Sequence, residues 1–466
     1  MATVKKQTSG KKMGGNKPSV KATGVSETKK CNEGLLRFIE ESPNAYFAVR
    51  EIGKLLDGAG FERLTETEKW DLKAGKAYYV TRDESSVLAF RTPKGRTLSF
   101  DSFQIVASHT DSPTFKVKPD AEMTAEDAYI KLNTEKYGGM ILYSWLDRPL
   151  SVAGRIALET KEGIRTRLVK IDRDLLVIPS LAIHMDRTLN DGYSFHPQKD
   201  MLPLFAQKTE DGADLMELVA REAGVKKEEI LDADLYLYSR VKGSLFGAED
   251  EFVGSGRLDD LQCAYASVQS LIGAQCGKNV AVCAVFNNEE VGSSTKQGAA
   301  SSFLETVLGR IASAAGKSEE EKICALSKSF LISADNAHAV HPNHTDKADP
   351  TNRPKLNGGI VIKYNANQKY TSDAVSGAAF KKICKKAGVP VQTYVNRSDI
   401  AGGSTLGSIA VSRVSMHSVD IGLPQLAMHS AYETAGSRDT RYLVKALETF
   451  YGLTITAESD GLLRME

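Results

Sequence analysis

Residues 280–294 read VAVCAVFNNEEVGSS, an apolar run that ends abruptly at two adjacent carboxylates. The run from Val280 to Phe286 predicts a buried strand, and the glycine and serines that follow predict a turn. Successive side chains on a strand point to opposite faces, but the chain bends at a strand end, so Glu289 and Glu290 can both reach one pocket. One carboxylate could then bind a metal ion while the other transfers protons, although such a pair also suits an ordinary solvated surface.

The overall composition is that of an ordinary globular protein. The chain has 466 residues, a formal net charge of +1 and 26% charged residues. This length predicts two or three domains, and the balanced charge argues against nucleic acid or a membrane as a partner. No apolar stretch approaches the roughly 20 residues that span a bilayer. The six cysteines are scattered without a Cys-x-x-Cys pair, which is typical of reduced thiols and predicts a cytoplasmic protein.

Changes in sequence pattern divide the chain into three parts. Residues 1–30 are rich in Lys, Gly and Ser and predict a disordered basic tail. Residues 120–247 contain alternating segments such as 151–158, which predict the antiparallel strands of an inserted β-rich domain. Residues 31–119 and 248–466 alternate apolar strands with helical stripes. They predict a metal-binding catalytic α/β domain, with a mostly parallel sheet covered by helices on both faces.

Acidic and histidine side chains follow the predicted strands of the α/β domain. Ligands of open α/β sheets bind at the carboxyl ends of strands, so these side chains are candidates for one site. Each alone has an ordinary explanation, such as a helix cap, a turn or a core histidine. The candidates are His109 and Asp111 after the strand at 104–108, Glu289 and Glu290 after 280–286, Asp335 after 330–334, Asp259 at a helix start, and His429 near the C-terminus.

Carboxylates and imidazoles in this combination suit two divalent ions. Two ions held about 3.5–4 Å apart, with one carboxylate between them, can clamp a hydrolytic transition state. Donors that are His and carboxylate without cysteine favour zinc, with cobalt or manganese as alternatives. Glu289 could remain free of metal and accept a proton from water. Asp111, two residues after His109, could hydrogen-bond the second imidazole nitrogen and fix the orientation of the ring.

Together these motifs resemble the aspartyl aminopeptidase family of di-zinc exopeptidases. The matching segments, in chain order, are SHTDSP at 108–113, GRLD at 256–259, NEEVGS at 288–293, DNAHAVHP at 335–342, NANQKY at 365–370 and PQLAMHS at 424–430. The resemblance implies that Asp259 bridges the two ions, that Glu289 is the general base and that Asp111 orients a histidine ligand. The metal ligands that it implies are His109, Asp259, Glu290, Asp335 and His429.

The resemblance also implies a fold of the zinc-exopeptidase type whose inserted domain dimerises, with the dimers assembling into a tetrahedral dodecamer. His184 would then enter a neighbouring subunit's site and stabilise the oxyanion, with a structural histidine as the alternative. His338, Lys363 and Tyr370 match substrate-binding positions. A lysine in the pocket suits an acidic first side chain, but it could equally be a structural ion-pair partner.

The predicted function is a cytoplasmic metal-dependent aminopeptidase that releases N-terminal residues, Asp or Glu among them, from peptides. The alternatives are an aminopeptidase for neutral or basic first residues, a related di-metal amide hydrolase, and a catalytically dead shell protein. Two positions depart from the family pattern: Asn287 stands where eukaryotic members commonly have Asp, and Asp260 where Asn often follows the bridging Asp. Neither departure removes a predicted ligand, but both bear on substrate preference and metal affinity.

Overall fold

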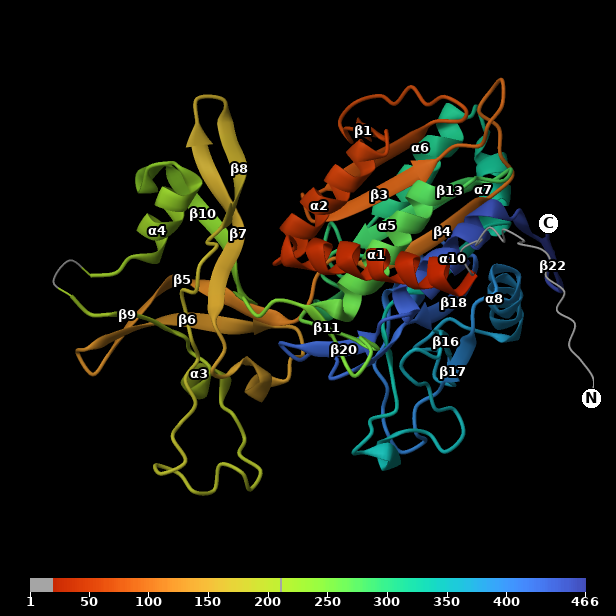
Figure 1. The fold of residues 1–466 in the computed structure, drawn as a ribbon. Coiled ribbons are helices and arrows are strands. Elements are labelled where there is room, and N and C mark those ends of the chain that lie inside the picture. The colour runs from red at the N-terminus through yellow and green to blue at the C-terminus, as the bar shows by residue number, and fades with distance from the viewer. Residues whose placement is uncertain (1–19, 210–211) are drawn as a thin grey trace, which may run out of the picture.

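The chain forms two lobes, one built on a nine-stranded sheet and the other on a six-stranded sheet (Figure 1). The computed structural model describes residues 20–209 and 212–466. In this described part, no helix is long and apolar enough to cross a membrane.

The nine-stranded sheet has the order β1-β2-β3-β13-β4-β14-β18-β16-β17. Its central strands β13, β4, β14 and β18 are parallel, whereas β3 and β16 run antiparallel to β13 and β18. The predicted α/β fold is therefore confirmed, with a mixed sheet whose parallel strands lie mainly at its centre. The strands are β1 (Glu62–Leu64), β2 (Ala77–Arg82), β3 (Ser86–Arg91), β4 (Phe103–His109), β13 (Val280–Phe286), β14 (Phe330–Ala334), β16 (Ile360–Lys363), β17 (Val391–Tyr394) and β18 (His417–Gly422).

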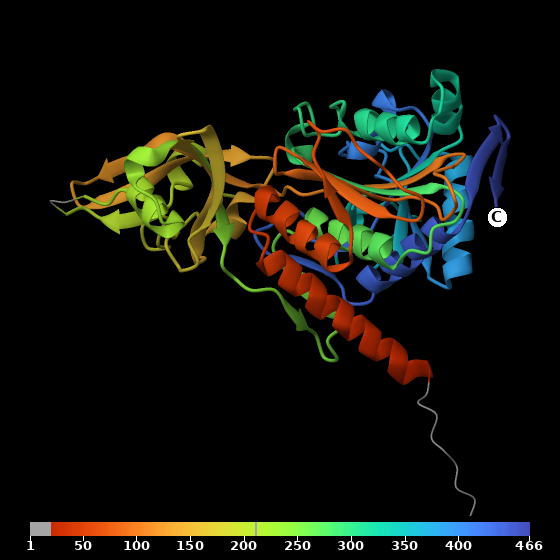
Figure 2. The same cartoon turned by 90° about the horizontal axis from the view of Figure 1, so that it is seen from above.

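Helices cover both faces of this sheet, as Figure 2 shows from above. Because side chains alternate along a strand, Val106 packs on one face and Ile105 on the other. The Val106 face is covered by α1 (Val20–Glu40), α2 (Ala45–Gly58), α5 (Leu258–Gly273), α8 (Ala374–Ala387) and α10 (Asp439–Gly452). The Ile105 face is covered by α6 (Phe303–Ala314), α7 (Glu319–Ser327) and α9 (Leu406–Arg413).

Helix α1 begins at Val20, so the prediction of a disordered tail over residues 1–30 is wrong for residues 20–30. The helix packs against α5 and α10 and buries Leu35, Phe38 and Ile39 in the core. An ion pair of 3.1 Å between Arg441 and Glu27 continues the contact with α10 toward the helix start. Burial and this contact stabilise a segment whose own composition favours solvent. The rest of the predicted tail, residues 1–19, lies outside the described residues.

The six-stranded sheet is wholly antiparallel and has the order β8-β7-β10-β5-β6-β9. Its strand β5 begins at Thr114, and the later β11 pairs with β12 outside this sheet. Both ends of the insertion therefore differ from the predicted 120 and 247, and its role in dimerisation stays a prediction. The elements of this lobe, in which η denotes a short 3-10 helix, are β5 (Thr114–Ala125), β6 (Tyr129–Tyr137), η1 (Leu142–Trp145), β7 (Leu150–Thr160), β8 (Gly163–Lys170), α3 (Pro197–Asp200), β9 (Leu204–Gln207), α4 (Leu215–Ala223), η2 (Lys227–Glu229) and β10 (Ile230–Ser239).

A five-stranded sheet of order β11-β12-β20-β19-β15, which the sequence patterns did not predict, lies near the junction of the lobes (Figure 1). It pairs Glu433 on β20 with Ser255 on β12, which brings the chain around residue 429 close to the start of α5. Its strands are β11 (Ser244–Phe246), β12 (Phe252–Ser255), β15 (Ala337–His338), β19 (Pro424–Leu426) and β20 (Glu433–Gly436). The remaining elements are η3 (Glu289–Val291), η4 (Thr345–Lys347), β21 (Ile455–Ser459) and β22 (Leu462–Met465).

Candidate metal centre

Strand pairing brings the sequence motifs to one edge of the nine-stranded sheet. Strands β4 and β13 are parallel and place His109 opposite Phe286, three residues before Glu289. Strand β14 lies on the other side of β4 and leads into Asp335. The carboxyl ends of three neighbouring strands thus meet, as expected for a binding edge of an α/β sheet.

The side chains at this edge form three overlapping groups of potential metal donors. In each group, the donor atoms lie within 4.8 Å of one another. The groups are His109 with Asp259, Asp260 and Asp335; His109 with Glu289 and Glu290; and Asp259 with Glu290 and His429. Every residue that the sequence analysis proposed as a ligand is therefore in the cluster, together with the proposed base, Glu289.

Asp259 lies between the two histidines. Its Oδ1 atom is 3.4 Å from Nε2 of His109, and its Oδ2 atom is 3.3 Å from Nε2 of His429. Nε2 of His429 is also 3.4 Å from Oε1 of Glu290. Each oxygen of one carboxylate therefore faces a different imidazole, which is the arrangement that a bridging ligand needs.

These separations fit the donor set of zinc. Tetrahedral zinc with bonds of 2.0–2.2 Å to nitrogen and oxygen places neighbouring donors about 3.3–3.6 Å apart. Among the described residues, Oδ1 of Asp259 and Oε1 of Glu290 are buried and receive no hydrogen bond. Buried carboxylate oxygens without a hydrogen bond are costly, and a divalent cation would satisfy them.

The protonation equilibria of the cluster also reflect excess negative charge. Burial raises the pKa of Glu289 to about 8, with the charges of Asp335 and Asp111 adding to the shift. Burial and the nearby Asp259 carboxylate raise the pKa of Glu290 well above its usual value. Burial alone would raise the pKa of Asp259, but the imidazoles of His109 and His429, which face its two oxygens, hold this pKa below its usual range. A cation in the cluster would relieve this repulsion.

Asp111 supports both the first histidine and the loop after β13. Its backbone oxygen lies 3.1 Å from Nδ1 of His109, and its Oδ1 atom lies 3.4 Å from the same nitrogen. The carboxylate also accepts hydrogen bonds from the backbone nitrogens of Glu289 and Glu290, at 3.2 and 3.1 Å. Asp111 thereby directs Nε2 of His109 toward Asp259 and shapes the turn that carries both glutamates.

His429 is held by residues that the sequence analysis did not identify. Its Nδ1 atom lies 2.6 Å from the carbonyl oxygen of Gly139, which leaves Nε2 facing Asp259 and Glu290. The carboxylate of Glu433 accepts hydrogen bonds from the backbone nitrogens of both His429 and Asp259, at 2.7 and 3.1 Å. One buried carboxylate therefore links the two segments that meet at the predicted bridging position.

A cavity of about 310 Å³ opens beside the cluster, and the predicted substrate-binding residues His338, Lys363 and Tyr370 are among the residues that line it. Nζ of Lys363, however, lies 2.8 Å from the backbone oxygen of Asp335 and 3.2 Å from that of Asn336. It is also 3.5 Å from the Asp335 carboxylate. These contacts favour the alternative that Lys363 is a structural ion-pair partner of Asp335 and does not bind an acidic substrate side chain.

His184 does not join this cluster within its own chain. It lies in a loop of the six-stranded lobe and is exposed, as are Leu181, Ile183 and Met185 around it. It is not among the residues that line the cavity. Its predicted entry into a neighbouring subunit's site stays a prediction.

Three further residues around the centre were not named as ligands or catalytic groups, although Asp260 was noted as a departure from the family pattern that bears on metal affinity. Asp260 is in the cluster, and its Oδ2 atom accepts a hydrogen bond of 3.0 Å from the backbone nitrogen of His109. Glu433 and Tyr137 bind the backbone of Asp259 and the side chain of Asp111, respectively. Asp260 adjoins a recognised motif, which is why the sequence analysis could place it near the bridging Asp259. Glu433 and Tyr137 carry no local signal, because distant strands bring them to the site.

Comparison with known proteins agrees with the motif resemblance. A family model described as "Aminopeptidase I zinc metalloprotease (M18)" matches residues 38–451. A "Probable M18 family aminopeptidase 2" of Clostridium novyi (strain NT) is 49% identical over 433 residues, which cover 92% of this chain and all of that protein.

Solved structures agree as well. A structure described as "Cryo-EM structure of the Ape4 and Nbr1 complex" has a TM-score of 0.87 and 37% identity, covering 93% of this chain and 87% of the other. The "Structure of S. cerevesiae mApe1 dodecamer" has a TM-score of 0.80 and 27% identity, covering 91% of this chain and 97% of the other. The chain therefore belongs to the M18 family of zinc aminopeptidases.

Proposed function

We propose that this metallopeptidase removes N-terminal residues from peptides at the cluster around Asp259. His109, Asp259, Glu290, Asp335 and His429 would hold two divalent ions, with zinc favoured by the donor set. The observation that carries the proposal is the placement of the two Asp259 oxygens 3.4 and 3.3 Å from Nε2 of two different histidines. A single carboxylate shared in this way suits a pair of ions.

Different residues of the chain have different roles in the proposed reaction. Divalent ions in such a site supply Lewis-acid polarisation of the scissile carbonyl and make a water molecule more acidic. Glu289 accepts the proton of the attacking water and delivers it to the leaving amine. Asp111 keeps His109 in one orientation and holds the Glu289–Glu290 turn in place.

A substrate panel tests the proposed reaction. Aspartyl, glutamyl, leucyl and lysyl chromogenic substrates should be compared with zinc, cobalt and manganese added separately, together with N-acetylated peptides. We expect turnover of free N-termini that stops when the metal is removed, with N-acetylated peptides left intact. Cleavage of N-blocked peptides would instead support a carboxypeptidase or deacylase. The rates on the four substrates would establish whether acidic, neutral or basic first residues are preferred.

Replacing Lys363 with Met tests the role of this buried lysine. Because its Nζ atom contacts Asp335, we expect kcat/KM to fall by a similar factor, roughly 10- to 100-fold, on aspartyl and leucyl substrates. Zinc affinity should fall as well. A fall in kcat/KM confined to aspartyl and glutamyl substrates would show that Lys363 binds the acidic side chain of the substrate instead.

We also propose that the chain forms a homo-oligomer built from dimers of the six-stranded lobe. The S. cerevesiae mApe1 dodecamer, which the chain resembles over 91% of its length, supports this proposal. The exposed apolar side chains Leu181, Ile183 and Met185 flank His184, as expected of a loop that packs against another subunit. In that arrangement His184 would donate a hydrogen bond to the developing oxyanion of its neighbour.

A mixing experiment tests whether His184 acts in the site of a neighbouring subunit. We expect His184→Ala to lower kcat by roughly 10²- to 10³-fold, the usual cost of losing one oxyanion donor. When His184→Ala and Glu289→Gln subunits are dissociated, mixed and reassembled, part of the activity should return. The reason is that some sites would combine an intact Glu289 with an intact His184. If the mixture stays as inactive as its components, His184 does not act between subunits.

A further inference from the structure

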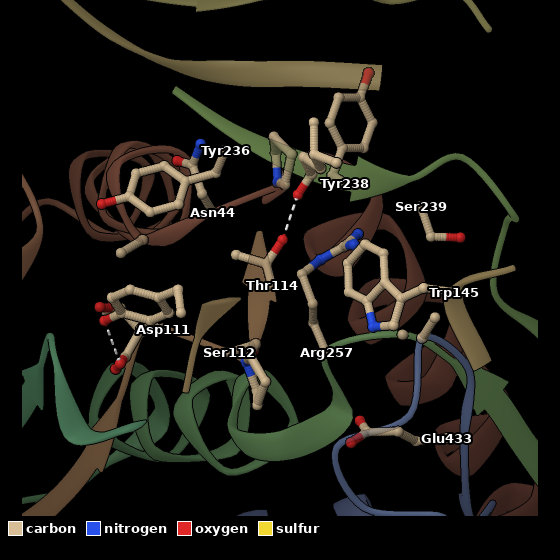
Figure 3. Close-up of a pocket in the computed structure, with 18 of the residues that line it drawn as sticks. Asn44, Asp111, Ser112, Thr114, Trp145, Tyr236, Tyr238, Ser239, Arg257 and Glu433 are labelled. Atoms are coloured by element: carbon tan, nitrogen blue, oxygen red, sulfur yellow. Dashed lines mark hydrogen bonds between the residues drawn. The ribbon is translucent and has the colours of Figure 1, made fainter. Parts of the chain in front are cut away.

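The segment from Tyr137 to Gly139, at the end of strand β6 in the six-stranded lobe, contacts several residues of the metal centre in the other lobe. The hydroxyl of Tyr137 donates a hydrogen bond of 2.7 Å to Oδ2 of Asp111. Figure 3 labels Asp111 and marks a hydrogen bond at its carboxylate with a dashed line. The same hydroxyl accepts a hydrogen bond of 2.8 Å from Nδ2 of Asn288, the residue before Glu289. The Tyr137 side chain, which belongs to the inserted lobe, therefore contacts both Asp111 and the residue that begins the turn carrying Glu289 and Glu290.

The next two residues contact the centre from the same side. Gly138 has a φ of +78°, and a Cβ atom placed there would lie 3.2 Å from Cβ of Glu290. The carbonyl oxygen of Gly139 lies 2.6 Å from Nδ1 of His429. Glycine is needed at 138 because both its backbone conformation and the close approach of Glu290 disfavour a side chain.

The position of this segment follows from strand pairing. Strand β5 begins immediately after the SHTDSP motif, and its first residue, Thr114, pairs with Tyr137 on β6. The antiparallel pairing brings the end of β6 back to Asp111, so the lobe that leaves the site at residue 113 returns to it at residue 137. Burial and the Asp111 charge raise the pKa of Tyr137 above its usual value, so its hydroxyl keeps the proton that it donates.

We propose that Tyr137, Gly138 and Gly139 form a positioning segment through which the inserted lobe sets the geometry of the metal centre and of Glu289. This inference rests on the proposed function and extends it, because it gives the six-stranded lobe a role inside its own subunit's site. Tyr137 acts on Asp111 and Asn288, while Gly139 selects the ring orientation that turns Nε2 of His429 toward Asp259. Such supporting contacts are usually worth 10- to 100-fold in metal affinity or activity.

Tyr137→Phe is the direct test, and Tyr236→Phe is its matched control. The two rings pack edge to face with centroids 5.7 Å apart. Both line a second cavity, shown in Figure 3, which is not the 310 Å³ cavity beside the cluster. In the part of the chain that the structure describes, the Tyr236 hydroxyl makes no hydrogen bond to the metal centre. Both variants therefore remove one hydroxyl from the same buried region, but only Tyr137→Phe removes a contact with Asp111 and Asn288.

For Tyr137→Phe we expect kcat to fall roughly 10- to 100-fold with KM nearly unchanged, and zinc to be lost at a correspondingly lower chelator concentration. Tyr236→Phe should match the wild type in all three measurements. Gly138→Ala, which displaces the same segment without removing a hydrogen-bonding side chain, should also weaken zinc retention. Unfolding of the metal-free proteins in urea identifies any general loss of stability.

The outcomes separate this inference from the proposed function. If Tyr137→Phe and Tyr236→Phe give equal kcat and equal zinc retention while Glu289→Gln is inactive, the positioning segment is refuted and the aminopeptidase proposal stands. A Tyr137→Phe variant that loses urea stability but keeps wild-type zinc retention would also refute it, because the hydroxyl would then be only structural. If the wild type shows no metal-dependent aminopeptidase activity, the proposed function fails, and zinc retention alone decides the role of Tyr137.

Discussion

Glu289→Gln is expected to lower kcat by roughly 10²- to 10⁴-fold while leaving the zinc content unchanged. The amide keeps the size of the side chain but cannot accept a proton from water. Zinc content should persist because all five residues of the proposed ligand set remain, and because the backbone nitrogen of residue 289 still donates a hydrogen bond to Asp111. Steady-state rates on the preferred chromogenic substrate, with metal analysis of the same sample, measure both quantities.

Glu320→Gln is the control for this substitution, because it changes an exposed glutamate in α7. It should retain wild-type rates and zinc content. Turnover by Glu289→Gln near the wild-type rate would refute the assignment of the general base. Loss of zinc together with activity would instead place Glu289 among the metal ligands, where one donor group also includes it.

Asp259→Asn is expected to remove most of the bound zinc and nearly all of the activity. Its two oxygens face Nε2 of His109 and of His429, so a neutral amide would weaken both parts of the centre at once. The substitution also removes a negative charge from the cluster, which reduces its attraction for cations. Metal analysis after gel filtration in zinc-free buffer, followed by rates with zinc added back, gives the measurement.

Asp250→Asn, at an exposed turn with a φ of 57°, is the matched control because Asn tolerates the left-handed conformation as Asp does. It should bind zinc as the wild type does. Loss of a single zinc ion from Asp259→Asn, with the other held as tightly as in the wild type, would contradict the bridging role. Full activity would contradict the location of the site itself.

The α/β architecture could be predicted because its signals are local. The apolar run at 280–286 and the shorter run at 330–334 are buried strands β13 and β14, at the bounds that the pattern indicated. The starts of strand β5 and helix α1 show where prediction from local signals fails. The pairing of β5 with β6 extends the inserted sheet back to Thr114, and α1, which packs against α5 and α10, begins at Val20. Both boundaries depend on partners far away in the sequence.

The candidate cluster was predictable for a related reason. In a parallel sheet, polar residues that follow consecutive buried strands reach the same edge, so His109, Glu290 and Asp335 could be grouped without knowing any distance. The roles of Lys363 and His184 could not be decided in this way. Lys363 faces the backbone oxygen of Asp335, and His184 is exposed within its own chain.

Strand periodicity was thus enough to identify the fold class, and the motifs at the strand ends carried the family resemblance, which implied the residues that gather at the centre. The supports of that centre depended on the folded chain: Tyr137 meets Asp111, Gly139 meets His429 across 290 residues, and Glu433 joins His429 to Asp259. The physical reason is that strand pairing between distant segments creates these contacts. No local periodicity records which carbonyl or hydroxyl will face a given imidazole or carboxylate.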